Sequence, residues 1–167
     1  MIERLRGVTQ VDRVRRNHAL EHAAITIITE RHPRVLLRGR SNSRGFYIFG
    51  DVPTDELRSA VDEALIRMHD GEEELAIHPR CGTNLAVASI LSGLSAAAAS
   101  RLRPRQNSWS YAVLAAMAAL FVAPSIGTEA QRHLTTLADL GDLRVTGIER
   151  RTRPVLGDTY HFVSTES

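Results

Sequence analysis

Two histidines and a glutamate in the segment Asn17-His18-Ala19-Leu20-Glu21-His22 have residue types and spacing suited to metal chemistry. Residues four positions apart lie on one face of a helix, so His18 and His22 could present two imidazoles to one ion. Glu21 lies near the same edge, where a carboxylate can take a proton from metal-bound water. The spacing therefore predicts a metal site in which His18 and His22 are ligands, with Glu21 beside them. The alternative is a helix whose two histidines only make hydrogen bonds.

A second pair of possible ligands, His78 and Cys81, stands three residues apart in the segment His78-Pro79-Arg80-Cys81. Imidazole and thiolate are both good zinc ligands at about this spacing. With His18 and His22 they would complete a closed tetrahedral site of structural type. If only one of them binds with His18 and His22, the fourth position of the zinc ion stays open for water. The alternative is that Cys81 is a small buried apolar residue and His78 a loop residue.

The residue order His-x-x-Glu-His over 18–22 resembles the motif of the inverted-zincin metallopeptidases. This resemblance covers five residues. It implies that His18 and His22 bind zinc and that Glu21 is the base of a hydrolase or peptidase.

Two long stretches without a charged residue, 81–100 and 106–128, flank the basic link 101–105. A helix needs about 20 mainly apolar residues to cross the hydrocarbon core of a membrane. The second stretch meets this length, and Trp109 near its start is typical of an anchor at the membrane interface. We predict a two-helix transmembrane hairpin over 81–128. The alternative is a soluble α+β interaction protein in which both helices are buried.

A transmembrane hairpin makes the lipid bilayer the expected partner of the protein. Ser89 and Gly93 stand four residues apart and offer a smooth face to other membrane helices or to a second copy of the chain. Arginines in the link favour a cytoplasmic link, which would require the arginine-rich segment 1–80 to cross the membrane without a signal peptide. The membrane orientation therefore stays open. Glu129 or His133, just after the hairpin, could reach the metal site.

The polar segments 1–80 and 129–167 predict a small mixed α/β domain of the α+β class, split by the hairpin. Apolar spacing near 3.6 residues predicts a helix over 13–31, and Thr54 is a suitable N-cap for a second that ends at Gly71. Short apolar or alternating runs predict strands at 35–37, 46–49, 75–77, 143–148 and 159–163. Polar connections are predicted over Gly39 to Gly45 and around Pro154 and Gly157.

The composition excludes several classes of protein. The 167 residues contain one cysteine, which excludes a disulfide scaffold and a four-cysteine zinc module. All 21 basic residues are arginine, so no lysine chemistry is available. The net charge of +2 argues against nucleic acid as a partner.

Three motifs together resemble an uncharacterised bacterial membrane-protein family, a domain of unknown function. They are NHALEH in the first helix, HPRCGTNL before the hairpin and QRHLTT after it, and the resemblance spans about residues 14–137. It implies a small membrane-associated protein at the cell membrane and no particular reaction. Two functions remain: a non-enzymatic membrane subunit with a possible His/Cys zinc site, and a membrane-proximal zinc-dependent hydrolase or peptidase.

Overall fold

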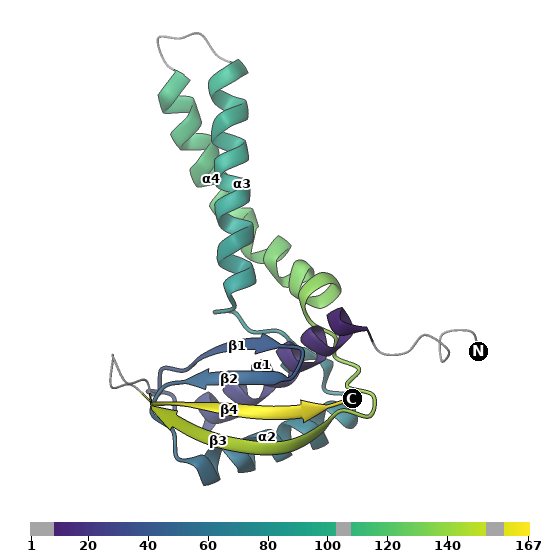
Figure 1. Ribbon diagram of the computed structural model, residues 1–167. Helices are drawn as coiled ribbons and strands as arrows, with labels where there is room; N and C mark the ends of the chain where they lie inside the picture. Colours follow the sequence, from purple (N-terminus) through teal and green to yellow (C-terminus); the bar gives the residue numbers. More distant parts are fainter. Residues whose placement is uncertain (1–8, 103–107, 153–158) are drawn as a thin grey trace, which may run out of the picture. The chain divides into compact units, whose positions relative to one another are not determined.

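The computed structural model describes residues 9–102, 108–152 and 159–167. Two compact units make up the chain (Figure 1): Met1–His78 with Leu134–Ser167, and Pro79–His133. The predicted α+β class is confirmed, since one unit is a mixed α/β domain and the other is a pair of long helices. The link from 103 onward and the connection with Pro154 and Gly157 lie outside the described residues.

The first unit is a four-stranded antiparallel sheet with two helices on one face (Figure 1). Its strands follow the spatial order β1-β2-β4-β3. The central strands β2 and β4 pair with each other, which joins the part of the chain before the helical pair to the part after it. Its elements are α1 (Gln10–Arg31), β1 (Arg38–Asn42), β2 (Gly45–Phe49), α2 (Thr54–His69), the 3₁₀ helix η2 (Glu73–Ala76), β3 (Arg144–Thr152) and β4 (Thr159–Glu166).

The core of this unit lies between the helices and one face of the sheet. Phe46 and Ile48 of β2 alternate with outward-facing residues and are fully buried, as is Val163 opposite Phe46 on β4. They pack in one apolar cluster with the inward residues of the helices, chiefly Leu20, Ala24, Ile27 and Ile28 of α1 and Leu57, Val61 and Ala64 of α2. Each large apolar side chain buried in this way contributes about 1.5–3 kcal/mol.

Helix α1 starts three residues earlier than the apolar spacing predicts. Thr9 accepts a hydrogen bond from the Asp12 backbone N–H through its Oγ1, at 3.1 Å. The Asp12 carboxylate accepts one in return from the Thr9 backbone N–H, at 3.2 Å, which completes a capping box. These hydrogen bonds from Thr9 lower the pKa of Asp12. The cap fixes where the helix begins.

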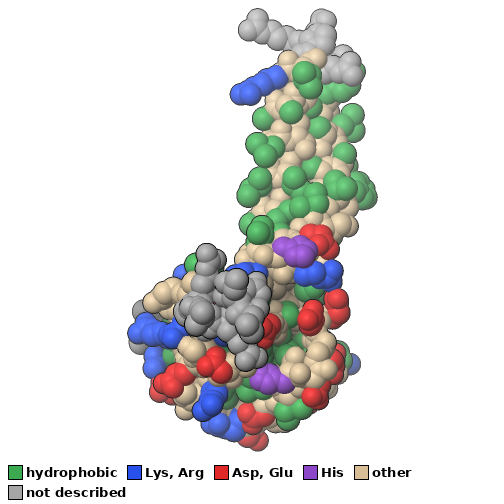
Figure 2. All heavy atoms as spheres, turned by 90° about the vertical axis from the view of Figure 1, so that its right-hand side faces the viewer, with side chains coloured by type: hydrophobic (Ala, Val, Ile, Leu, Met, Phe, Trp, Pro, Cys, Tyr) green, Lys and Arg blue, Asp and Glu red, His purple; other side chains and the backbone are tan. Residues whose placement is uncertain are grey.

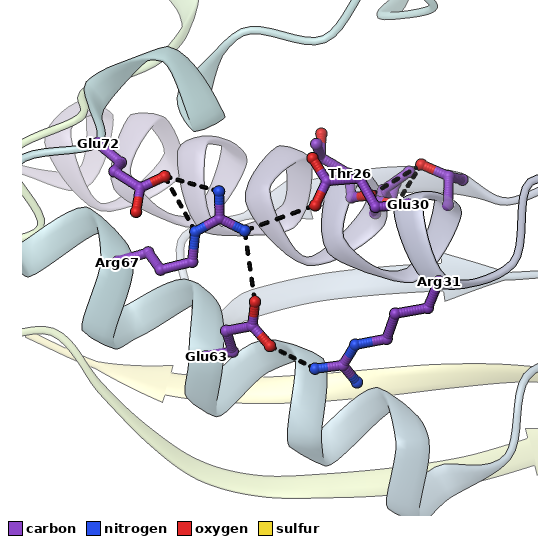
Figure 3. A network of polar contacts seen from close by, with 8 residues as sticks. Thr26, Glu30, Arg31, Glu63, Arg67 and Glu72 are labelled. Atoms are coloured by element: carbon purple, nitrogen blue, oxygen red, sulfur yellow. Dashed lines mark hydrogen bonds and ion pairs between the residues drawn. The ribbon is translucent and has the colours of Figure 1, made fainter.

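A network of ion pairs ties α1 to α2 on the exposed side (Figure 3). Arg67 of α2 contacts Glu72 at 2.6 Å, Glu63 at 3.3 Å and Glu30 of α1 at 3.5 Å. Glu63 also pairs with Arg31 at the end of α1. The hydrogen bond with Glu72 raises the pKa of Arg67 and lowers that of Glu72. Because these groups face solvent, each pair adds little to the stability of the unit.

Three predicted elements are wrong. The turn predicted over 39–45 is mostly strand β1, and Ser43 and Arg44 alone connect it to β2. Polar residues form β1 because it is an edge strand, and the apolar run 35–37 that was predicted as a strand precedes it. The strand predicted at 75–77 is replaced by η2, because this short run buries Leu75 and Ala76 without a neighbouring strand to pair with.

The second unit consists of α3 (Gly82–Leu102) and α4 (Ser108–Ala130), which continues into the π-helical turn η3 (Gln131–Thr135). Small residues let α3 and α4 approach closely. A Cβ on Gly127 would lie 2.3 Å from Asn84 Oδ1, and the same Oδ1 accepts a hydrogen bond from Gln131 at 2.8 Å. Ser92 donates across the pair to the Ala116 carbonyl at 3.3 Å.

Both helices of this unit are long and apolar enough to cross a membrane. Along α3 no residue is buried, and along α4 the buried residues are the small Ala119, Ala123 and Gly127. The large apolar side chains point outward instead, as the space-filling view makes plain (Figure 2). Among them are Leu85, Ile90, Leu94, Leu114, Met117 and Phe121.

Candidate metal centre

Helix α1 brings His18 and His22 together as their spacing predicts. Their ring centroids lie 4.3 Å apart, with the rings inclined at 61°. One ring nitrogen of each lies within 4.8 Å of the other. Two nitrogens bound to one zinc ion stand about 3.4 Å apart, given Zn–N bonds of about 2.0–2.1 Å and tetrahedral angles. The two rings are therefore near the separation that a shared ion requires.

Backbone carbonyls determine which nitrogen of each ring can bind a metal. His18 Nδ1 lies 2.9 Å from the Thr135 carbonyl oxygen, and His22 Nδ1 lies 2.7 Å from that of Ala76. Because a carbonyl oxygen can only accept, both Nδ1 atoms carry the hydrogen. The lone pair of each neutral ring is then on Nε2. This is the arrangement that orients metal-binding histidines in zinc sites.

The same two hydrogen bonds hold the chain where it leaves and re-enters the α+β unit. Ala76 is the last residue of η2, shortly before the helical pair, and Thr135 ends η3 after it. Arg15 strengthens the second attachment by donating to the Thr136 carbonyl at 2.9 Å, and its own carbonyl accepts from Leu137. His22 is 2% exposed, so it is part of the core of this unit as well as a possible ligand.

The second pair of predicted ligands, His78 and Cys81, comes shortly after η2 in the chain. The His78 ring lies 5.7 Å from that of His22, so three imidazoles gather around one turn of α1. Cys81 is half-buried and immediately precedes α3, where its Sγ accepts a hydrogen bond from the Thr83 N–H at 3.4 Å. Within the α+β unit, His18, His22 and His78 are neighbouring side chains of a type that zinc takes as ligands.

Glu21 is buried and is directed toward β1. Its Oε2 accepts a hydrogen bond from Ser41 Oγ at 2.6 Å. Its other oxygen packs so closely on Gly39 that a Cβ there would lie 2.0 Å away. On a helix, Glu21 is turned by about 60–100° from the two histidines, which accounts for its different neighbours. Its predicted role as a base stays a prediction.

Asn17 is a buried polar residue that joins α1 to the edge strand β1 and the central strand β4. Its Nδ2 donates to the Asn42 carbonyl of β1 at 2.8 Å, and its Oδ1 accepts from Thr165 of β4 at 2.6 Å. No pattern along the sequence marks these partners, because they come from strands far away in the chain. Glu129 and His133, the other residues considered, lie 3.1 Å apart on exposed turns of the second unit.

Comparisons with known proteins assign a family and no activity. The sequence profile of a domain of unknown function, DUF6391, matches residues 13–148. This match confirms the resemblance to a family of unknown function that the motifs indicate. An uncharacterised protein of Picosynechococcus sp. is 37% identical over 168 aligned residues, which cover 94% of this chain and 81% of the relative. No solved structure matches the chain.

Proposed function

We propose that this chain, which belongs to the DUF6391 family, is a small integral-membrane protein whose α+β domain binds one zinc ion and acts as a non-enzymatic membrane subunit. The observation that carries the metal is the matched orientation of His18 and His22. Each donates its Nδ1 hydrogen to a backbone carbonyl, which makes Nε2 the nitrogen whose lone pair would bind a metal.

The remaining ligands are His78 and Cys81. His78 already has its ring beside that of His22. Three residues of chain reach at most about 10 Å, so Cys81 can follow His78 to the same ion. A thiolate also neutralises one positive charge of zinc, which three neutral imidazoles do not. Two histidines of α1, His78 and Cys81 would make a closed tetrahedral site, as structural zinc requires.

The orientation of Glu21 favours a structural zinc over a hydrolytic one. A general base must lie within hydrogen-bonding reach of the water it activates. Both carboxylate oxygens of Glu21 have neighbours on β1, where Ser41 donates to one and Gly39 packs on the other. A hydrolase would need this carboxylate to leave a buried position.

Metal analysis of the full chain, purified in detergent without chelators, tests the zinc site. We expect about one zinc per chain, lost in His22→Gln and retained in His69→Ala, since His69 is an exposed histidine of α2. Circular dichroism establishes that the variants are folded. Wild-type protein that contains no zinc, and takes none up from a zinc buffer, contradicts the proposal.

Cobalt substitution tests the ligand set independently of activity. A cobalt–thiolate bond gives an intense charge-transfer band in the near ultraviolet, which imidazole ligands do not give. We expect this band in wild-type protein and its loss in Cys81→Ser. Its absence from wild type would remove Cys81 from the site. The Glu21→Gln variant separates the two functions: hydrolytic activity in the wild type that this variant lacks, with zinc retained, supports the hydrolase.

The outward apolar surface of the helical pair supports its insertion in the bilayer. Soluble proteins seldom leave long helices hydrophobic all round and exposed to water. Leu114 and Phe121 of α4 are 62% and 86% exposed, and they stand seven residues apart on one face. In a bilayer these side chains contact lipid, which removes the cost of exposing them to water.

Alkaline extraction of membranes tests the insertion. We expect wild-type protein to stay in the membrane pellet and Leu114→Arg/Phe121→Arg to be released, because each arginine at the centre of the bilayer costs about 2.5–3.5 kcal/mol. Ile66→Arg is the matched control, because Ile66 of α2 is as exposed as Leu114, at 62%. Release of wild-type protein into the soluble fraction would refute the membrane assignment.

A further inference from the structure

The face of the sheet turned away from the helices carries a cluster of four aromatic side chains, called here the open aromatic face: Tyr47 and Phe49 of β2, Tyr160 and Phe162 of β4. Register pairs Tyr47 with Phe162 and Phe49 with Tyr160. The first pair has ring centroids 4.7 Å apart and the second 5.6 Å apart. All four are half-buried, so their rings stay accessible on the two central strands.

Arginines border the open aromatic face on both edges. Arg38 and Arg40 of β1 stand opposite Phe49 and Tyr47 in the register, and both are exposed. On the other edge, Arg151 of β3 lies with its guanidinium 5.9 Å from the centre of the Phe162 ring.

The acidic residues that the register places on this side of the described strands lie away from β1: Glu149, which Arg151 binds at 2.6 Å, and Glu166 at the end of β4, opposite Arg144. The face is therefore positive on the β1 edge. There a cavity of about 490 Å³ opens, lined by Arg40, Ser41, Asn42, Tyr47, Phe49 and Tyr160. A ligand in this cavity meets flat rings, an amide and a guanidinium.

We propose that the open aromatic face binds single-stranded nucleic acid. Unpaired bases stack on aromatic rings regardless of their sequence, and their phosphates pair with arginine at the border. An antiparallel sheet with aromatic residues on its central strands is a known way to hold two or three bases. Charge complementarity favours an anionic ligand over an uncharged aromatic one, because Arg38 and Arg40 stand beside the rings in the register.

This proposal departs from the expectation that nucleic acid is not a partner. That expectation rests on the net charge of the whole chain, which averages over all faces. Pairing of the strands collects arginines on one face, while the acids of α1 and α2 lie with the helices on the other. An anionic membrane is the weaker alternative, because half-buried rings in a flat sheet cannot penetrate between lipids.

Fluorescence anisotropy with labelled ten-nucleotide strands, rU10 and dT10, tests the proposal on the full chain in neutral detergent. Wild-type protein should bind at about 50 mM salt, where phosphate contacts are strong. Tyr47→Ala should weaken binding by about fivefold or more, and Tyr47→Phe should retain it, because the ring and not the hydroxyl stacks on the base. Tighter binding of rU10 than dT10 identifies RNA, and the reverse identifies DNA.

Charge variants give a readout that a folding defect does not reproduce. Arg38→Ala/Arg40→Ala should lower the slope of log K against log salt by about 0.7 for each phosphate that is no longer neutralised. Arg58→Ala, on the exposed side of α2, is the matched control and should change nothing. The proposal is overturned if wild type fails to bind either strand, if Tyr47→Ala binds as tightly as wild type, or if the face binds anionic vesicles or a second copy instead.

Discussion

Replacing Gly39 by alanine should destabilise the α+β unit through one contact, that between the new Cβ and Glu21. The Cβ would lie 2.0 Å from Glu21 Oε1, 2.2 Å from Cδ and 2.6 Å from Cγ. Gly39 has no positive φ, so alanine suits its backbone and the effect is purely steric. An ordinary contact needs about 3.4 Å, so the carboxylate must withdraw by about 1.4 Å.

The magnitude follows from what this withdrawal breaks. Glu21 is 4% exposed, so its carboxylate has little room to move. Losing the hydrogen bond from Ser41 leaves a buried carboxyl oxygen unsatisfied, which costs about 1–3 kcal/mol, and overpacking adds about 1–3 kcal/mol. We expect Gly39→Ala to lower the free energy of unfolding by about 3–5 kcal/mol.

Urea unfolding of the full chain in detergent, followed by circular dichroism, measures this effect in a double-mutant cycle. In the Glu21→Ala background the carboxylate is gone, so Gly39→Ala should cost less than about 1 kcal/mol. Ser41→Ala provides the value for the hydrogen bond alone. An equal cost of Gly39→Ala in both backgrounds would refute the proposed contact between Gly39 and Glu21.

Three further predictions concern the same unit. Asn17→Ala leaves buried partners on β1 and β4 without hydrogen bonds and should cost about 2–4 kcal/mol, measured by the same unfolding assay. Burial and the Arg150 charge lower the pKa of His161 below its usual 6.5, so the unfolded chain binds more protons. The contribution of His161 to the free energy of unfolding should therefore be largest above about pH 6.5 and should decrease as the pH drops below it. His161→Gln should make the free energy of unfolding less dependent on pH in this range. Thr9→Ala removes the capping box and should cost about 1 kcal/mol, visible as faster amide exchange in the first turn of α1.

Local patterns predict the elements that depend on neighbouring residues. The apolar spacing of α1 and of α2, and the lengths of the two uncharged stretches, follow from periodicity and hydropathy along the chain. Periodicity does not identify strand β1, because Arg38 and Arg40 give this edge strand the polar composition of a turn. A short apolar run such as 75–77 is equally ambiguous. It forms a strand where a neighbouring strand can pair with it and a 3₁₀ helix where none can, and the sequence of the run does not distinguish the two.

The candidate metal site divides in the same way. The spacing of His18 and His22 places both rings on one face of a helix wherever that helix packs. Which nitrogen of each ring carries the hydrogen depends on carbonyls of Ala76 and Thr135, far away in the sequence. The orientation of Glu21 depends on Ser41 of a strand that the sequence alone does not predict.

Local sequence therefore predicts the helices, the pair of apolar stretches and the spacing of the histidines, because these properties arise between residues a few positions apart. The tertiary structure alone decided the hydrogen bonds of the histidines and the environment of Glu21. It also decided the open aromatic face, which requires β2 and β4 to pair although they come from opposite ends of the chain. Such pairings depend on the free energy of the whole core, and no local pattern contains that information.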